Sequence, residues 1–346
     1  MSFKVKAGAV EIGGGAPVSV QSMTNTRTSD VKGTLAQIDS LFRAGCEIVR
    51  VAVRNEQDAS AISDIVKESP LPVVADIHFD YRLAITAAKN GAAKIRINPG
   101  NIGGEDKVKR LADVLGGAGI PVRIGVNGGS LESEFGGLPL YKAMAESALS
   151  HLAMLEKAGF HDTVISVKSS DVVQTVKAYR LLASETDNPL HIGITEAGTV
   201  KSGLIKSSAG IGSLLLDGIG DTVRVSLTAR PEEEVFAARK LLNCLGLRKD
   251  MPEVISCPTC GRTEIDVQGL ADAVEQIAVQ AGKPLKIAVM GCVVNGIGEG
   301  KEADFGVAGG KEKSVLFKKG KKYKTVPNGE ILEQMKLLIG EYEADD

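Results

Sequence analysis

The feature that most constrains the fold is a regular alternation of short strand-like runs with helical segments. Eight runs rich in β-branched residues recur between residues 18 and 227, and seven of the gaps between or after them carry apolar residues at helical spacing. The runs are Val18 to Met23, Ile48 to Val53, Pro72 to His78, Lys94 to Asn98, Val122 to Val126, Thr163 to Lys168, Leu190 to Thr195 and Thr222 to Leu227. Eight such units predict an α/β fold, a closed TIM (β/α)8 barrel. An open doubly wound sheet is the alternative, which the count of eight and the short loops disfavour.

The pattern changes near residue 250, so we predict two domains. Residues 1–250 would form the barrel and bind the substrate, and residues 251–346 a smaller mixed α/β domain. In the second domain we expect a helix at Leu270 to Ala281, a strand at Leu285 to Met290, a basic hairpin at Ser314 to Val326 and a last helix at Ile331 to Tyr342.

Composition narrows the class of partner and the compartment. A net charge of −2 gives no nucleic-acid or membrane footprint, and no apolar run reaches the length of a transmembrane helix. The segment from Met1 to Gly15 is polar and glycine-rich, unlike a signal peptide, and unpaired cysteines suit a reducing compartment. We therefore expect a cytoplasmic protein.

Cations stand where buried parallel strands are normally aliphatic. Four runs carry a central arginine and a fifth ends in lysine: Arg50, Arg96, Arg123, Arg224 and Lys168. Because side chains alternate along a strand, these cations should point into the barrel if their aliphatic neighbours pack under the helices. The carboxylates at comparable positions, Asp76 and Glu196, are too few to neutralise them, so an anion such as a diphosphate should complete the site. Structural ion pairs inside the barrel are the alternative.

Polar residues at the strand ends point to the same place. Catalytic groups of barrel enzymes lie at the carboxyl ends of the strands, where this chain has Asp76, His78, Asn98, Asn127 and Glu196. Glu196 is the best candidate to exchange a proton with a leaving hydroxyl.

Two connections between strands and helices add candidates. The segment from Gly128 to Leu138 is long enough for a mobile active-site loop, or else is a solvated surface excursion. The segment from Gly198 to Gly220 includes Ser207 and Ser208, which could donate to a phosphate from a loop.

Four potential metal ligands crowd a short C-terminal stretch: Cys257, Cys260, Cys292 and Glu299. All four histidines lie before residue 200, so none is near in sequence to complete a zinc site. Three thiolates and an exchangeable oxygen ligand suit an iron-sulfur centre. A structural zinc site that borrows Cys244 or a distant histidine stays open. It would accompany a different function, a phosphate-binding barrel transferase or aldolase with a zinc tail.

These motifs together resemble the bacterial 4-hydroxy-3-methylbut-2-enyl diphosphate synthases of the non-mevalonate isoprenoid pathway. The resemblance runs nearly end to end, through Val20-Gln-Ser-Met-Thr24, Ala75-Asp-Ile-His-Phe79, Lys94-Ile-Arg-Ile-Asn-Pro-Gly-Asn101, Arg123-Ile-Gly-Val-Asn-Gly-Gly-Ser-Leu131, Gly193-Ile-Thr-Glu-Ala-Gly198, Ser256-Cys-Pro-Thr-Cys-Gly261 and Met290-Gly-Cys-Val-Val-Asn-Gly-Ile-Gly-Glu299. It implies a [4Fe-4S] cluster on Cys257, Cys260, Cys292 and Glu299, and reductive ring opening of 2-C-methyl-D-erythritol 2,4-cyclodiphosphate with loss of water.

The resemblance also suggests roles and partners. The five cations, helped by Asn98, Asn127 and the segment of Ser207 and Ser208, would hold the cyclic diphosphate. Asp76, His78 and Glu196 would lie at the reacting carbons, with Glu196 as proton donor. A head-to-tail homodimer is implied, in which one subunit's cluster domain caps the other's barrel. The lysines from Lys313 to Lys324 would attract an acidic electron donor, flavodoxin or ferredoxin, or else form a solvated face.

Overall fold

The chain divides into two units, Met1–Leu245 and Gly246–Asp346. The computed structural model describes residues 2–98, 102–135, 137–294 and 296–343. Residues 99–101 and 295, which belong to two of the motifs, and residue 136 of the long connection lie outside the described residues. The domain boundary expected at residue 250 stands close to the observed division.

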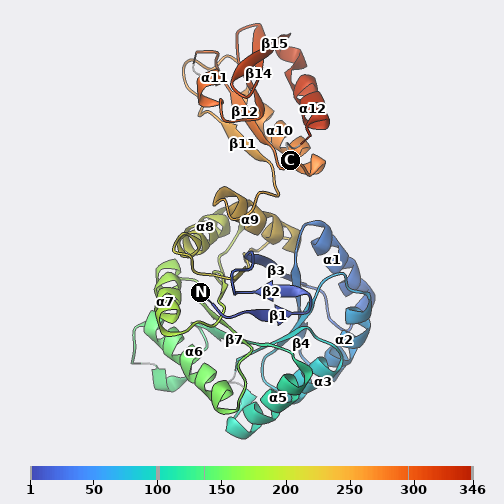
Figure 1. Ribbon diagram of the computed structural model, residues 1–346, viewed down its shortest axis with the longest axis vertical. Coiled ribbons are helices and arrows are strands. Elements are labelled where there is room, and N and C mark those ends of the chain that lie inside the picture. Colours follow the sequence, from blue (N-terminus) through green and yellow to red (C-terminus); the bar gives the residue numbers. More distant parts are fainter. Residues whose placement is uncertain (1, 99–101, 136, 295, 344–346) are drawn as a thin grey trace. The chain divides into compact units, whose positions relative to one another are not determined.

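The first unit is a barrel of eight parallel strands inside a ring of helices (Figure 1). The strands are β3 (Ser19–Met23), β4 (Ile48–Val53), β5 (Val73–Ile77), β6 (Lys94–Ile97), β7 (Val122–Asn127), β8 (Thr163–Lys168), β9 (His191–Ile192) and β10 (Thr222–Val223). They follow the order β8-β7-β6-β5-β4-β3-β10-β9, and a parallel bridge between Ile165 and Leu190 joins the two ends. The predicted barrel is confirmed.

Helices cover the outside of this barrel. They are α1 (Val31–Arg43), α2 (Glu56–Glu68), α3 (Tyr81–Lys89), α5 (Glu105–Ala118), α6 (Leu140–Lys157), α7 (Val172–Glu185), α8 (Val200–Leu216) and α9 (Pro231–Cys244). Side chains of Asp30, Asn55, Asp80 and Asp171 cap four of them by accepting hydrogen bonds from first-turn amides. The outward aliphatic residues of the strands pack under these helices in one continuous core, which leaves the other face of each strand for the barrel interior.

The last two strands are shorter than the predicted runs Leu190 to Thr195 and Thr222 to Leu227. Beyond them the two connections bond to each other, with Thr228 N donating to Gly198 O. In this part of the barrel rim, a hydrogen bond between the two connections therefore replaces the regular pairing of strands.

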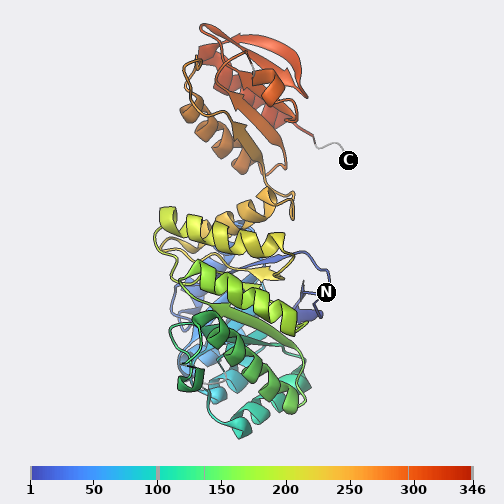
Figure 2. The same ribbon diagram turned by 90° about the vertical axis from the view of Figure 1, so that its left-hand side faces the viewer.

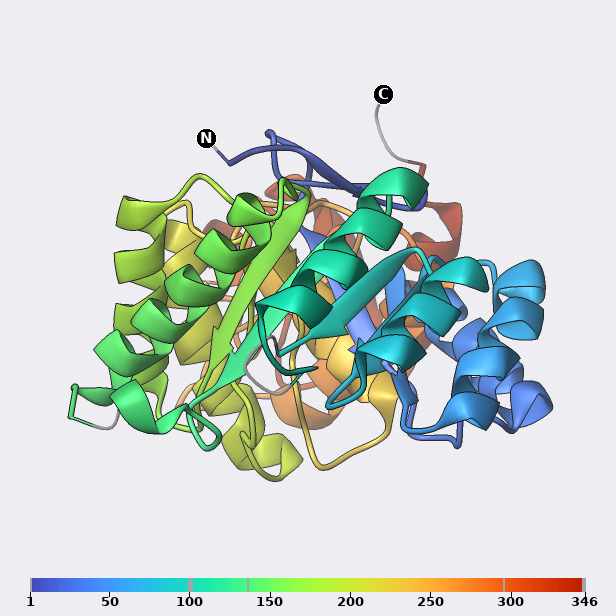
Figure 3. The ribbon, with the colours of Figure 1, turned by 90° about the horizontal axis from the view of Figure 1, so that it is seen from below.

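An N-terminal hairpin closes the floor of the barrel, at the end where the strands begin (Figure 3). Strand β1 (Val5–Ala7) pairs with β2 (Val10–Ile12), and its buried residues pack against Ile48, Val74 and Val164 from the barrel strands. From the sequence, we expected this segment only to be polar and glycine-rich. The short apolar alternation was missed because glycines and charges dominate the segment's average composition.

The second unit is a five-stranded mixed sheet with helices on both faces (Figure 2). Its strands, in spatial order, are β11 (Glu253–Ser256), β12 (Lys286–Met290), β13 (Phe305–Ala308), β14 (Lys313–Lys318) and β15 (Lys321–Pro327). The first three are parallel, and β14 and β15 form an antiparallel hairpin. Helices α10 (Val267–Ala281) and α12 (Ile331–Glu341) share one core cluster, and the short α11 (Gly296–Glu299) packs with the other.

Strands β11 and β13 were not among the predicted elements, whereas the two long helices, β12 and the hairpin were. Among the described residues, the protein has no helix of the length and apolarity that crossing a membrane requires.

Candidate functional site

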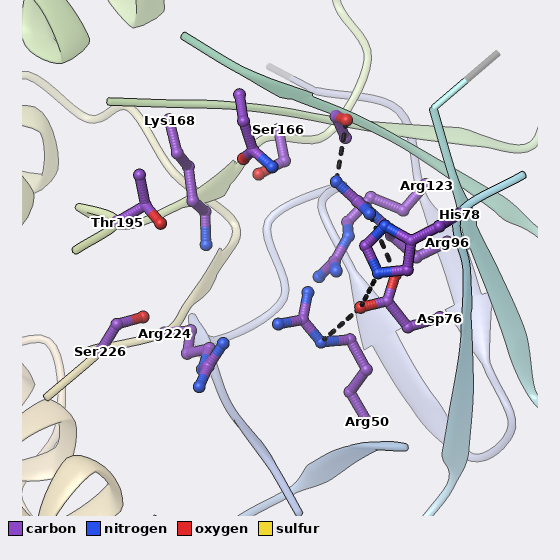
Figure 4. Close-up of a pocket in the computed structure, with 12 residues that line it drawn as sticks. Arg50, Asp76, His78, Arg96, Arg123, Ser166, Lys168, Thr195, Arg224 and Ser226 are labelled. Carbon is purple, nitrogen blue, oxygen red and sulfur yellow. Dashed lines mark hydrogen bonds and ion pairs between the residues drawn. The ribbon is translucent and has the colours of Figure 1, made fainter. Parts of the chain in front are cut away.

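A cavity of about 130 Å³ opens where the barrel strands end, and five of its twelve lining residues are arginine or lysine (Figure 4). The predicted residues that line it are Arg50, Asp76, His78, Arg96, Arg123, Asn127, Lys168 and Arg224. The strands carry these residues on their inward faces, at alternate positions. Asp76 on β5 and His78, which directly follows β5, are an example. The structure therefore brings together most of the predicted mouth.

Asp76 is the centre of the ion pairs in this cavity. Its Oδ1 accepts from Arg96 Nη1 at 3.1 Å, and its Oδ2 lies 3.6 Å from Arg50 Nε and 3.8 Å from His78 Nε2. Burial alone would raise the pKa of Asp76, but the charges of Arg50 and Arg96 lower it to about 2. Asp76 is thus a carboxylate at any physiological pH, and it pairs with Arg50 and Arg96.

The arginines are fixed by backbone and side-chain partners as well. Arg96 Nη2 donates to Gly125 O at 2.9 Å, and a Cβ at Gly125 would collide with the Arg96 guanidinium. Arg123 Nη1 donates across the barrel to Gln21 Oε1 at 2.5 Å. Burial, followed by the charge of Arg50, lowers the pKa of Arg123, yet a guanidinium keeps its proton because its ordinary pKa is above 12.

A second carboxylate reaches the cations from outside the strands. Glu234, in the first turn of α9, accepts from Arg224 Nη2 at 3.3 Å and from Leu227 N at 2.9 Å. The sequence reading had counted Glu196 in this place. Glu234 was missed because it comes from a helix, and the signal was the run of three glutamates after Pro231. Even with Glu234, cations outnumber carboxylates in the mouth.

Glu196 and Asn98 stand apart from the other predicted residues. Neither lines the cavity, although Thr195 beside Glu196 does. Asn98 is buried at the end of β6. Glu196 is exposed and has φ +50°, a left-handed conformation that is unfavourable for a non-glycine residue and often marks functional segments.

Ser207 and Ser208 do not lie on a loop, so that expectation is wrong. Both are in the middle of α8, with Ser207 buried and Ser208 exposed. Gly203, Ser207 and Gly210 share one face at helical spacing, and a Cβ at Gly203 or Gly210 would come within 2.5 or 2.6 Å of Leu227 or Ile194. The small residues let the helix approach the barrel closely and were misread as loop formers.

The long connection from Gly128 to Leu138 is tied to α6. Glu132 accepts from Ser147 Oγ at 2.8 Å and lies 3.1 Å from His151 Nε2. These contacts tie Glu132, in the middle of the connection, to α6, while the other described residues of the connection are exposed or half-buried.

Four further lining residues were missed in the sequence: Gly125, Ser166, Thr195 and Ser226. Strand alternation could have found two of them, because Ser166 lies two residues before Lys168 and Ser226 two residues after Arg224. They bring hydroxyl groups, which are hydrogen-bond donors suited to an anion.

The C-terminal cysteines gather at one edge of the second sheet. Cys257 directly follows β11, and Cys292 follows β12, its parallel neighbour. Glu299 is the last residue of α11, which begins at Gly296. A Cβ on Gly296 would lie 2.8 Å from the Cβ of Ala308, at the end of β13, so α11 packs closely against this strand. All four candidate ligands are thus on connections that leave the carboxyl ends of adjacent strands or on the helix that follows.

These thiols differ from the barrel cysteines in chemistry. Cys260 is exposed, and a backbone hydrogen bond at Arg262 lowers its pKa. Cys257 Sγ accepts from Gly291 N at 3.1 Å. Burial raises the pKa of Cys46 to about 12, and Cys244 is exposed at the end of α9 in the first unit. The thiolate is the metal-binding form, so Cys260 is a better donor than the buried Cys46.

The residues present fit an iron-sulfur group by donor chemistry and by position on adjacent connections. Within the described parts of the chain, no three His, Cys, Asp or Glu side chains already converge on one point in metal-binding geometry. Assembly would therefore need the cysteine connections to adjust around the group.

Comparisons with known proteins cover both units. The GcpE TIM-barrel domain matches residues 2–239, and the GcpE protein C-terminal domain matches residues 253–341. A relative from Caldanaerobacter subterraneus subsp. tengcongensis is 56% identical over 97% of this chain and 95% of its own length. One from Thermotoga maritima is 52% identical over 99% and 98%. Both are named 4-hydroxy-3-methylbut-2-en-1-yl diphosphate synthase (flavodoxin).

Solved structures add a likeness in fold alone. Dihydropteroate synthase from Yersinia pestis is 13% identical with a TM-score of 0.52, and it covers 71% of this chain and 100% of that one. A spore coat polysaccharide biosynthesis protein from Bacillus subtilis is 12% identical with a TM-score of 0.51, covering 71% and 74%. The likeness is to the barrel type. The transferase alternative is not favoured, because the near full-length relatives carry a different name.

Proposed function

This chain belongs to the GcpE family, and from that premise we propose that it makes 4-hydroxy-3-methylbut-2-enyl diphosphate for isoprenoid synthesis. The reaction opens the ring of 2-C-methyl-D-erythritol 2,4-cyclodiphosphate reductively and releases one hydroxyl as water. The resemblance inferred from the motifs is confirmed by the two domain matches and by the relatives. The chain is thus an oxidoreductase, and the observation that carries this function is the excess of cations in the barrel mouth.

The cations of the mouth bind the cyclic diphosphate in this proposal. The residues are Arg50, Arg96, Arg123, Lys168 and Arg224, with Asn127 beside them, and Asn98, which does not line the cavity, is kept as a further proposed contact. An arginine fork gives two parallel hydrogen bonds to phosphate oxygens, and the ion pairs of Asp76 already hold Arg50 and Arg96 in place. Because the site is prearranged, little order has to be gained when the substrate binds. Ser207 and Ser208 have no part in this binding, because they lie in the middle of α8.

Proton transfer falls to Glu196. Asp76 has a pKa of about 2 and is therefore too weak a base to carry a proton to the leaving hydroxyl. We assign Asp76 and His78 to orienting the substrate beside the arginines. Glu196 is exposed next to the lining residue Thr195, and its backbone has the left-handed conformation. A protonated Glu196 would donate to the departing oxygen.

An iron-sulfur group completes the site in the same proposal. Cys257, Cys260, Cys292 and Glu299 would hold a [4Fe-4S] cluster, and when bound this group supplies electrons one at a time. Glu299 is exposed at the end of the short helix α11, and as the one oxygen ligand it would be the most exchangeable of the four. The relatives are named for flavodoxin, so flavodoxin, or ferredoxin in its place, is the proposed donor. We propose that the lysines of β14 and β15 attract this acidic electron donor.

A head-to-tail homodimer is the proposed assembly. Helix α9 ends on the floor side of the barrel, where Arg239 donates to Ala44 O at the end of α1. The link to the second unit therefore leaves the barrel at the end opposite to its mouth. In the proposed dimer, the cluster ligands at each barrel mouth would come from the partner subunit. The cytoplasmic location stays a prediction, supported by the free thiols.

Anaerobic reconstitution with iron and sulfide tests this function. We expect a brown protein whose visible absorbance is bleached by dithionite, and turnover of the cyclic diphosphate with reduced flavodoxin. Cys257→Ala should lose both, and Cys244→Ala, an exposed thiol in the barrel unit, should keep both. A colourless protein that binds zinc would overturn the proposal in favour of the transferase alternative.

A further inference from the structure

Below the cations of the mouth, a lysine is sealed inside the barrel. Lys94 is the first residue of β6 and lies two residues before Arg96, so both side chains point into the barrel. Lys94 has no exposed surface, and its Nζ has no hydrogen-bond partner among the described residues. The function proposed above gives this side chain no role.

Other groups at the same depth do not compensate it. His191 begins β9, is fully buried, and neither ring nitrogen has a partner in the described chain. The hydroxyls of Ser19 and Thr222, which begin β3 and β10, are also buried and unpartnered there. The N-terminal hairpin closes the floor beneath with apolar side chains. Among the described residues, these polar atoms at this level therefore lack partners, and no carboxylate is among the groups that act on Lys94.

The charged groups that face Lys94 are cations. Arg123 and Arg50 act on Lys94, and Lys168, Arg123, Lys94 and Arg50 act on His191. The carboxylates of the mouth are engaged by other cations, Asp76 by Arg50 and Arg96, and Glu234 by Arg224. An ammonium buried without a partner among like charges is strongly unfavourable. Burial, followed by Arg123 and then Arg50, holds the pKa of Lys94 well below its ordinary value.

We propose that Lys94 is an uncharged amine in the ligand-free barrel and takes up one proton when a dianion fills the cavity above it. Arginines keep their protons, so the ligand-free barrel lowers its excess charge by deprotonating an amine. A bound dianion offsets the field of Arg50 and Arg123, and the lone pair of Lys94 Nζ then accepts a proton from solvent. The new ammonium attracts the ligand from beneath without touching it.

This inference rests on the proposed function for its ligand, the cyclic diphosphate. Each phosphorus of that ligand carries a single strongly acidic hydroxyl, so the ligand does not titrate near neutral pH. Proton uptake on binding can therefore be assigned to the protein. Because binding would take up a proton, affinity should rise as pH falls, by up to roughly tenfold per pH unit.

Calorimetry measures the proton directly. The cyclic diphosphate is titrated into the oxidised, reconstituted protein without reductant, at about pH 8, in buffers of different ionisation enthalpy. The slope of the heat against that enthalpy counts protons. We expect the wild type to take up roughly one proton more than Lys94→Met. Lys168→Met and His191→Gln should keep the uptake, although Lys168→Met binds more weakly.

Each result decides between the two proposals. If the ligand does not bind the wild type, the proposed function fails and the inference falls with it. If it binds without a buffer-dependent heat, only the inference fails, and this wild-type result suffices should Lys94→Met not fold. Uptake that persists in Lys94→Met, or that disappears in Lys168→Met or His191→Gln instead, also overturns it.

Discussion

The barrel mouth and the cysteine edge of the second unit are built on opposite principles. In the barrel, the functional side chains project from strands, are largely buried and are held by partners, such as Arg96 by Asp76 at 3.1 Å. In the second unit, the candidate ligands lie beyond the strand ends, with Cys260 and Glu299 exposed. The cation cluster of the barrel is held by its own ion pairs, whereas the candidate metal ligands do not converge within the described residues.

The largest expected effect is a loss of stability when Asp76, the carboxylate at the centre of the barrel mouth, is removed. Asp76→Ala leaves Arg50 and Arg96 buried without their acid, and such a loss destabilises a protein by about 3–5 kcal/mol. Urea unfolding followed by circular dichroism measures it. The exposed pair of Lys157 and Glu105 is the control, and Glu105→Ala should change stability by less than about 1 kcal/mol. Equal effects would mean that the mouth is not prearranged by charge.

The free energy of unfolding of the ligand-free protein should rise as the pH rises toward 10. The unfolded chain binds a proton on Lys94 up to about pH 10.4, whereas the folded pKa is far lower. Lys94 therefore contributes stability above the unfolded pKa that is lost as pH falls toward the folded value. Between roughly pH 8 and 10 this loss is about 1.4 kcal/mol per pH unit. Urea midpoints across that window should show it, and Lys94→Met should show a shallower slope. Equal slopes would contradict the expected titration.

How much the sequence could predict follows the same division. The alternation of strand residues placed Arg50, Arg96, Arg123, Lys168 and Arg224 in one mouth, because a parallel barrel leaves one geometric solution for such a pattern. Glu234 escaped prediction because a helix delivers it across the rim. Ser207 was misassigned because glycine and serine serve close helix packing as well as loops. The hairpin at Val5 to Ile12 was hidden by its short strands.

Thiol reactivity sharpens the contrast from the other side. In the metal-free protein, Cys260 should react with iodoacetamide a few-fold to roughly tenfold faster than Cys244, because both are exposed and the pKa of Cys260 is lowered. Cys46, buried with a pKa of about 12, should react only on unfolding. Peptide mass spectrometry gives the order. After reconstitution, Cys257, Cys260 and Cys292 should be protected while Cys244 stays reactive. Protection of Cys244 as well would contradict the assigned ligands.

The smallest expected effect separates Ser226, which the sequence analysis missed, from Ser208, which it proposed. Ser226 lines the cavity beside Arg224, whereas Ser208 faces outward from α8. Ser226→Ala should weaken binding of the cyclic diphosphate by about 0.5–1.5 kcal/mol, the net contribution of one hydrogen bond. Ser208→Ala should stay within about 0.5 kcal/mol of the wild type. If Ser208→Ala weakened binding as much as Ser226→Ala, the ligand would extend beyond the barrel mouth. The contrast between a prearranged anion site and an exposed metal edge would then have to include the outer helices.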